Sequence, residues 1–294
     1  MALFLCVLLK SICFGVFSFA SMLFAYNTEI VTHDSYKTEI FTSGSQGEVL
    51  LMVPGYSIPA DVIWQKQLRS LSQKFTVVTF NHIHRGRSQT SSFDYSLESY
   101  VRHVNSLIKK LDLKQFHLMA LSMGGPIAAE IAMTQSIKSL SLLCPAGVSR
   151  PSQRMSSLIK IPWLGELLMK VIPFFILNKT LKSFRAPEEK IIAILQKQFQ
   201  SDQYFQALLA TTRRFPFEPH LPRYSRLSKL PVPKAIAWGT KDEVLPYEGF
   251  GQIKLALPTA SAFSVPDQGH NLPYNAPHVV EMLLNAVVEE ETEH

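Results

Sequence analysis

Cysteine is scarce in this chain, with three in 294 residues. Cys6 and Cys13 lie near the N-terminus, and Cys144 stands alone in the body of the sequence. No two cysteines have the Cys-x-x-Cys spacing, and no Cys/His pattern matches a zinc site. The sequence therefore gives no indication of a metal held by cysteine, and so few cysteines say nothing about the redox compartment.

Compact runs of Lys and Arg are also absent, although the formal net charge is +6. The excess lies in the middle of the chain, where residues 151–235 carry 14 Lys and Arg against 5 Asp and Glu. These positive residues are scattered through apolar stretches, which favours a membrane-adjacent surface over a nucleic-acid groove. A solvated helix face is the alternative interpretation. We expect no nucleic-acid partner.

Charge is nearly missing from the N-terminus, where Lys10 is the single charged side chain in the first 28 residues. Lys10 followed by the apolar run Ile12–Phe19 is typical of an export signal. An uncleaved membrane anchor is the main alternative, because Ala2–Tyr26 is long enough to span a bilayer when tilted. A true start at Met22 is the third. We expect residues 1–26 to be a signal peptide or membrane anchor, which makes the protein exported or membrane-anchored; with a start at Met22 it is cytoplasmic.

Short apolar runs recur along the rest of the chain, residues 27–294, whose length suits one α/β domain. A hairpin is expected first, over Glu29–Phe41. Continuous apolarity without alternation is typical of parallel strands that are covered on both faces. The predicted buried strands are Val49–Val53, Thr76–Phe80, Phe116–Leu121, Ser139–Leu143, Lys234–Trp238 and Ala262–Val265.

Helical patterns separate most of these runs. They cover Ala60–Gln73, Ser96–Leu111, Pro126–Thr134 and Pro277–Glu290. Strands that alternate with helices of this length indicate a doubly wound, mostly parallel α/β sheet, whose ligands bind at the carboxyl ends of the strands. The alternation fails over about 147–230, where the helices Pro187–Gln200 and Gln203–Arg213 are expected. An insertion between two strands of one sheet predicts a helical cap over that edge.

The sharpest motif is Ala120–Gly125, which reads Ala-Leu-Ser-Met-Gly-Gly between a predicted strand and a predicted helix. A serine on such a sharp turn needs small residues on either side so that the backbone segments can pass each other. The helix that follows directs its positive end to the place where negative charge develops. We therefore predict that Ser122 is a nucleophile; an ordinary turn with a capping serine is the alternative.

An activated serine needs an imidazole to take its proton and a carboxylate to fix the imidazole tautomer. Asp242 follows the strand Lys234–Trp238, and His270 follows Ala262–Val265. The carboxyl ends of these strands meet at one edge of the sheet, so we predict His270 as the base and Asp242 as the acid. Asp267 is the alternative acid.

The strand-turn-helix motif around Ser122 is similar to the nucleophile elbow of the α/β-hydrolase family. The order Ser122, Asp242, His270 along the chain is also that of the family, and the resemblance extends from Glu29 onward. The resemblance implies an eight-stranded sheet with an inserted cap. It also implies an oxyanion hole from the backbone amides of Met123 and of Tyr56, in the loop Val53-Pro54-Gly55-Tyr56. The segment Asn81–Ser88 is similar to a structural loop of the family, and no catalytic role is expected for it.

A serine at the elbow separates the chain from family members that place aspartate there, the haloalkane dehalogenases and epoxide hydrolases. The resemblance therefore implies a serine hydrolase, and the apolar segment Leu158–Leu177 in the expected cap favours lipid-like carboxylic esters. A carbon-carbon bond hydrolase and a non-catalytic binding module are the alternatives. No metal or organic cofactor is expected, because protein groups supply each proton transfer and charge. The oligomeric state stays open.

Overall fold

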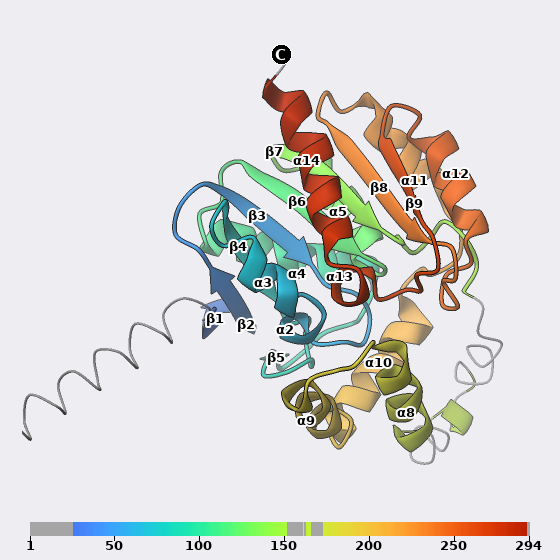
Figure 1. Cartoon of the computed structure of the whole chain (residues 1–294). Helices are drawn as coiled ribbons and strands as arrows, with labels where there is room; N and C mark the ends of the chain where they lie inside the picture. Colours follow the sequence, from blue (N-terminus) through green and yellow to red (C-terminus); the bar gives the residue numbers. More distant parts are fainter. Residues whose placement is uncertain (1–25, 152–160, 162, 166–172, 293–294) are drawn as a thin grey trace, which may run out of the picture.

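The computed structural model of the chain describes residues 26–151, 161, 163–165 and 173–292. One twisted sheet runs through these residues (Figure 1). Its strands follow the order β1-β2-β4-β3-β6-β7-β8-β9, and a short ninth strand, β5, pairs with β2. The bounds are β1 Asn27–His33, β2 Tyr36–Ser43, β3 Glu48–Val53, β4 Phe75–Phe80, β5 Gln89–Thr90, β6 Phe116–Leu121, β7 Ile137–Leu143, β8 Lys234–Gly239 and β9 Ser261–Val265. The eight strands expected from the resemblance are therefore present, with β5 added.

The sheet is parallel from β4 through β9. It is antiparallel where β1 pairs with β2 and where β2 pairs with β4 and with β5. Every residue of β6 and of β8 is buried, because helices cover both faces of these central strands. The continuous apolar runs of the sequence thus form the interior of a doubly wound sheet, as predicted.

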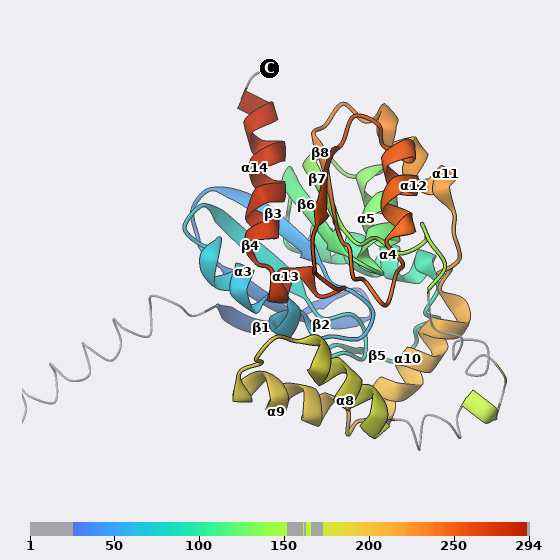
Figure 2. The same ribbon diagram turned by 45° about the vertical axis from the view of Figure 1, so that its right-hand side comes forward.

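Two layers of helices cover the sheet (Figures 1 and 2). On one face α13 contacts α2, α3 and α14, and on the other α5 contacts α4 and α11, which in turn contacts α12. The first layer consists of α2 Ala60–Ile63, α3 Gln65–Ser70, α13 Leu272–Asn275 and α14 His278–Thr292. The second consists of α4 Leu97–Lys110, α5 Gly124–Ala132, α11 Leu221–Ser225 and α12 Glu248–Ala256. Apolar side chains between the layers and the sheet form one continuous core.

Several helical segments differ from the prediction, because α8 (Pro173–Ser183), α11, α12 and α13 were not predicted and one predicted helix is divided. The range Ala60–Gln73, predicted as one helix, forms the two short helices α2 and α3, because the backbone leaves the helical region at Trp64 (φ −101°, ψ 11°). Gln67, the third residue of α3, donates its side-chain amide to the backbone carbonyl of Pro273 at 2.8 Å. Helix α12 was not predicted from the sequence, since Gly249 and Gly251 lower its helix propensity.

The cap lies between β7 and β8 in the chain and beyond the carboxyl ends of the strands (Figure 2). Its described helices are α8 Pro173–Ser183, α9 Glu189–Gln198 and α10 Asp202–Arg214. The last two match the predicted helices to within two residues. Helix α11 and the 3-10 turn Arg226–Lys229 also fall in the predicted range 147–230, but α11 packs beside the sheet against α5 and α12.

The predicted leader lies almost wholly outside the described residues, which begin at Tyr26. So does most of the apolar segment Leu158–Leu177. Within the part of the chain that the structure describes, no helix combines the length and apolarity needed to cross a bilayer.

Candidate active site

Ser122 lies at the turn between β6 and α5, with a positive φ of 55°. Residues other than glycine rarely adopt this backbone conformation, so neighbouring groups must hold the turn in place. The Ser122 amide donates to the carbonyl of Leu143 at 2.9 Å. Its carbonyl accepts from the amides of Gly125 and Ala146, each at 2.9 Å. Three backbone hydrogen bonds thus fix the strained turn at the carboxyl edge of the sheet.

Gly124, two residues after the serine, lies where the start of α5 crosses the end of β3. A Cβ atom at this position would lie 2.6 Å from the carbonyl oxygen of Val53 and 2.8 Å from that of Pro54. Neither oxygen can move without displacing the backbone. At Ala120, two residues before the serine, a methyl group is fully buried within β6. Serine turns of this kind usually have the pattern Gly-x-Ser-x-Gly, and here Ala120 stands in place of the first glycine.

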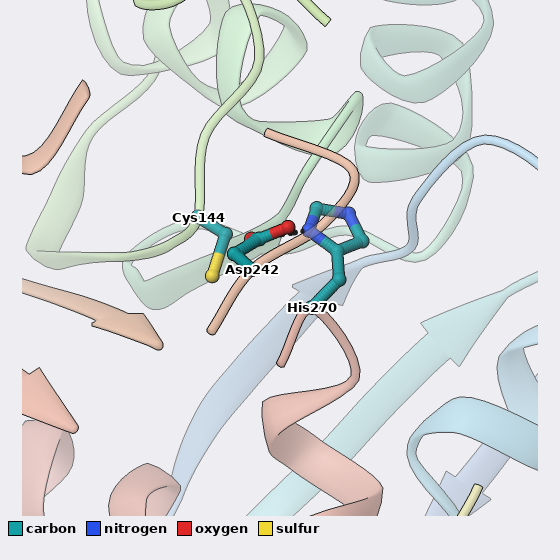
Figure 3. Close-up of side chains that lie close together, drawn as sticks. All are labelled: Cys144, Asp242 and His270. Carbon is teal, nitrogen blue, oxygen red and sulfur yellow. Dashed lines mark hydrogen bonds and ion pairs between the residues drawn. The ribbon is translucent and has the colours of Figure 1, made fainter. Parts of the chain in front are cut away.

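Asp242 and His270 approach each other from the ends of β8 and β9 (Figure 3). The distance from Oδ2 of Asp242 to Nδ1 of His270 is 2.7 Å. The second oxygen, Oδ1, accepts from the amides of Val244 at 2.8 Å and Leu245 at 2.9 Å. Both oxygens of the carboxylate thus accept hydrogen bonds from the protein, and these three bonds fix its orientation.

The charge of this carboxylate follows from the same contacts. Burial alone would raise the pKa of Asp242, because it removes water from the charged form. The His270 charge, the hydrogen bond from His270 and the two backbone amides outweigh burial and hold the pKa of Asp242 below its ordinary value. Asp242 is therefore an ionised hydrogen-bond acceptor at neutral pH.

The loop Pro54–Ser57 lies on the other side of the serine. A Cβ atom on Gly55 would be 3.4 Å from Cβ of Ser122, so the two residues are in contact. Met123 is fully buried at the start of α5. Among the described residues, no carbonyl or side chain accepts a hydrogen bond from the amides of Tyr56 or Met123. Both amides therefore keep an N–H group for another acceptor.

The structure thus brings the five predicted residues to one edge of the sheet in two groups. Asp242 and His270 form one, and Ser122 lies with Tyr56 and Met123 in the other. In the part of the chain that the structure describes, no hydrogen bond joins Oγ of Ser122 to His270.

Comparison with known proteins identifies the family of the chain. A sequence model of the alpha/beta hydrolase family matches residues 50–282. The chain belongs to the alpha/beta hydrolase family. The matched range contains the whole described site, from the loop Pro54–Ser57 to His270.

The curated relatives include monoacylglycerol lipase ABHD6 of Bos taurus. It is 24% identical over 275 residues, which cover 86% of this chain and 80% of that protein. Among solved structures, a membrane phospholipase A described as a bacterial virulence factor has a TM-score of 0.74 at 20% identity and full coverage of both chains. The haloalkane dehalogenase DbeA of Bradyrhizobium elkani USDA94 has a TM-score of 0.80 at 14% identity, covering 92% of this chain and 99% of the dehalogenase. Both structures share the alpha/beta hydrolase fold with this chain.

The alternative acid, Asp267, has Lys241 as its partner, and no described contact joins it to His270. It forms an ion pair with Lys241 at 2.7 Å, and about 70% of each side chain is exposed. Lys241 lowers the pKa of Asp267 by donating to it. The structure therefore gives the contact with His270 to Asp242.

Sequence reasoning missed Cys144 as a neighbour of this pair (Figure 3). Its sulfur lies within 4.8 Å of ligating atoms of both Asp242 and His270. Burial and the Asp242 charge raise the pKa of the Cys144 thiol well above its ordinary value, so the thiol stays protonated. A neutral thiol here packs near the Asp242 carboxylate without the repulsion that a thiolate would cause. No spacing in the sequence could have indicated this contact, because it depends on the pairing of β7 with β8.

Proposed function

We propose that the chain is a serine hydrolase of carboxylic esters, in which Ser122 forms an acyl-enzyme. The observation that carries the proposal is the 2.7 Å contact between Asp242 and His270 at the same sheet edge as the strained Ser122 turn. Asp242 holds Nδ1 of His270 in its protonated form, which leaves Nε2 free to accept a proton. A serine, a base and an orienting acid are the parts that nucleophilic acyl transfer needs.

The reaction follows from these roles. Oγ of Ser122 attacks the ester carbonyl carbon as Nε2 of His270 takes its proton, and the carbonyl oxygen becomes an oxyanion. The amides of Tyr56 and Met123 donate to that oxygen. Collapse of the tetrahedral intermediate breaks the bond to the alcohol, which leaves with the proton from His270. Water, deprotonated by His270, then releases the acid and restores Ser122.

A fluorophosphonate probe tests the nucleophile, because it labels only an activated serine. The wild-type chain should be labelled, and Ser122→Ala should not. Ser141→Ala is the matched control: this serine is also buried and lies on the neighbouring strand β7. We expect that control to be labelled normally. Folded wild-type protein that resists the probe would instead favour the non-catalytic binding module.

We propose lipid-like acyl substrates, because curated relatives over most of the chain are monoacylglycerol lipases. Apolar side chains of the cap, including Leu177 and Leu181, also pack against the hydrophobic core. Hydrolysis of p-nitrophenyl esters and monoacylglycerols of increasing chain length tests this. We expect preference for chains of about eight carbons or longer, which fill an apolar pocket. Turnover of a vinylogous diketone alone would favour the carbon-carbon bond hydrolase.

We also propose that the cap contacts a lipid surface. Trp163 is 72% exposed and Ile161 41% exposed, and Arg213 on α10 donates to the carbonyl of Ile161 at 3.1 Å. An exposed tryptophan two residues from the contact of a cationic side chain suits the interface of an anionic bilayer. Export or anchoring through residues 1–26 would bring the chain to such a membrane, and an intact Met1 in the membrane fraction would support the anchor.

Co-sedimentation with phosphatidylglycerol vesicles tests the cap surface. Trp163→Ala should weaken binding to these vesicles. Leu255→Ala is the matched control, because Leu255 is 85% exposed but lies on α12. Equal binding by both variants would contradict a role for the cap in membrane contact.

A further inference from the structure

The loop Pro54–Ser57 is held from the sheet side by two buried side chains. Nε2 of His82 lies 3.1 Å from the carbonyl oxygen of Pro54, and Nε of Arg85 donates to that of Tyr56 at 3.1 Å. Both side chains are 1% exposed. They fix the peptide planes on either side of the one that carries the Tyr56 amide.

The cap helix α10 holds the same loop from the opposite side. The hydroxyl of Tyr204 donates to the carbonyl of Ser57 at 3.0 Å. The hydroxyl of Tyr56 donates to the carbonyl of Leu208 at 2.7 Å and lies 2.6 Å from Oγ1 of Thr212. Tyr56, whose amide is the proposed oxyanion donor, is therefore bonded through its own side chain to α10.

The surroundings of the Tyr56 hydroxyl keep it in its donor form. Burial raises the pKa of Tyr56 to about 12. The guanidinium of Arg85 lies 5.8 Å from the Tyr56 ring centre, and its Nη2 contacts Thr211 of α10 at 3.4 Å. Phe217 packs edge-on against the same ring. Tyr56 therefore has one orientation, set jointly by the loop, Arg85 and α10.

We propose that α10 of the cap is a fixed part of the oxyanion hole, and that the Tyr56 side chain is the positioning group that couples them. This inference rests on the proposed function. The phenol ring and the amide belong to one residue, so the anchor on α10 limits the rotation of the N–H that donates to the oxyanion. Donors of this kind act only when aimed at the tetrahedral oxygen. The acyl chain must then reach Ser122 while α10 remains bonded to Tyr56.

The alternative is that the Tyr56 hydroxyl only attaches the cap to the sheet domain. Its removal would then lower stability without lowering kcat. The chain offers a matched control for this. Tyr100, fully buried on α4, forms a hydrogen bond of 2.8 Å with Thr211, the neighbour of Thr212 on α10. Tyr100→Phe removes a buried tyrosine–threonine bond to the same helix. Tyr100 contacts the loop only through the side chains of His82 and Arg85 and forms no described hydrogen bond with residues 54–57, so the comparison isolates the direct bond from Tyr56 to α10.

The test compares Tyr56→Phe, Tyr100→Phe and wild type with a p-nitrophenyl ester and with a trifluoromethyl ketone, which forms a tetrahedral adduct on serine. Both variants should lose similar thermal stability. Tyr56→Phe alone should lower kcat about tenfold, the scale of one hydrogen bond, with KM within about twofold. Its Kd for the trifluoromethyl ketone should rise by the same factor.

Thr212→Val provides a second variant that leaves Tyr56 in place. It should also lower kcat, by a smaller factor, because it removes only the Tyr56–Thr212 contact and leaves the bond to Leu208. Adding it to Tyr56→Phe should cause no further loss, because Tyr56→Phe has already removed that contact. If Tyr56→Phe does not fold, Thr212→Val decides on the same readouts.

Two results would overturn the inference, and they differ. If the wild type turns over ester and Tyr56→Phe keeps the kcat of Tyr100→Phe, the coupling is absent although the proposed function stands. If the wild type neither turns over ester nor reacts with the fluorophosphonate, the proposed function fails and this inference with it.

Discussion

The two sides of the candidate site are built from different materials. Around the serine, on the sheet side, the contacts are between backbone segments: the Ser122 amide donates to the carbonyl of Leu143, and Gly124 leaves no room for a methyl group beside Val53. On the cap side, long side chains reach across, as the hydroxyls of Tyr56 and Tyr204 do. The sheet side therefore has no tolerance for added atoms, whereas the cap side depends on single hydroxyl groups.

This difference predicts how the two sides respond to substitution. A change on the sheet side displaces reacting groups directly, so it should reduce the rate by orders of magnitude. A change on the cap side removes one hydrogen bond of modest net value, about 1 kcal/mol. Substitutions on each side, with matched controls, test this ranking.

The largest effect is expected for Asp242→Asn. The new amide NH₂ cannot accept from Nδ1–H of His270 while the amides of Val244 and Leu245 occupy the other oxygen. The imidazole then takes the wrong tautomer, and kcat should fall on the order of 10³- to 10⁴-fold. Ester hydrolysis measures the loss. Asp267→Asn, which breaks only the exposed ion pair with Lys241, should keep kcat within about twofold; equal losses in the two variants would contradict the assignment of the acid.

The next effect is expected for Gly124→Ala. Its methyl group would lie 2.6 Å from the carbonyl oxygen of Val53, so the end of β3 and the loop after it must shift. We expect a fall in kcat of about 100-fold and a loss of unfolding free energy of about 1–3 kcal/mol. Urea denaturation and ester hydrolysis measure both.

Gly251→Ala is the control for that substitution. Gly251 lies in α12, and a Cβ atom there has no neighbour within 4 Å. Alanine should raise the helix propensity and the unfolding free energy by up to about 1 kcal/mol, with no change in kcat. A stable and fully active Gly124→Ala would show that the sheet side tolerates added atoms after all.

The same difference explains how much of the site could be predicted from the sequence. Ser122 was predictable because its turn is a local device: a buried strand, a serine between small residues and a helix, all within a dozen positions. Asp242 and His270 were predictable because each follows a predicted parallel strand. Parallel strands bring their carboxyl ends to one edge of the sheet, so the loops after them could be placed at that edge without knowledge of the strand order.

Contacts that depend on distant side chains gave no such signal. The Tyr56 hydroxyl meets Leu208 across 152 positions in the chain. The neighbourhood of Cys144 and Asp242 requires the register of β7 on β8. The break at Trp64 follows from packing of α3 against α13, which an apolar pattern over Ala60–Gln73 does not contain. Local motifs therefore predicted the candidate site residues, whereas the contacts between the cap and the loop required the folded structure.

A third prediction concerns His82, which supports the loop from the sheet side. Burial and the Arg85 charge lower the pKa of His82 to about 3, against about 6.5 in the unfolded chain. The unfolded state therefore binds a proton that the folded state does not, and stability falls as pH drops from 6.5 toward 3. His82→Gln keeps a donor near the carbonyl of Pro54 but cannot titrate.

Thermal melts at pH 7, 6, 5 and 4 check this expectation. The wild type should lose more Tm between pH 7 and 4 than His82→Gln does. His103, whose pKa burial also lowers, remains in both proteins and leaves part of the slope. Parallel melting curves across this range would mean that His82 does not link protonation to folding.

The smallest effect on activity is expected for Gln198→Ala, on the cap side but away from α10. The side chain of Gln198, at the end of α9, accepts from the amide of Gly86 at 2.7 Å. Gly86 is exposed, so water can replace this acceptor, and the loss of unfolding free energy should stay near about 1 kcal/mol. Because Gln198 forms no described bond with residues 54–57, kcat should remain within about twofold of the wild type. A fall in kcat as large as that of Tyr56→Phe would show that the whole cap, and not α10 alone, positions the loop beside Ser122.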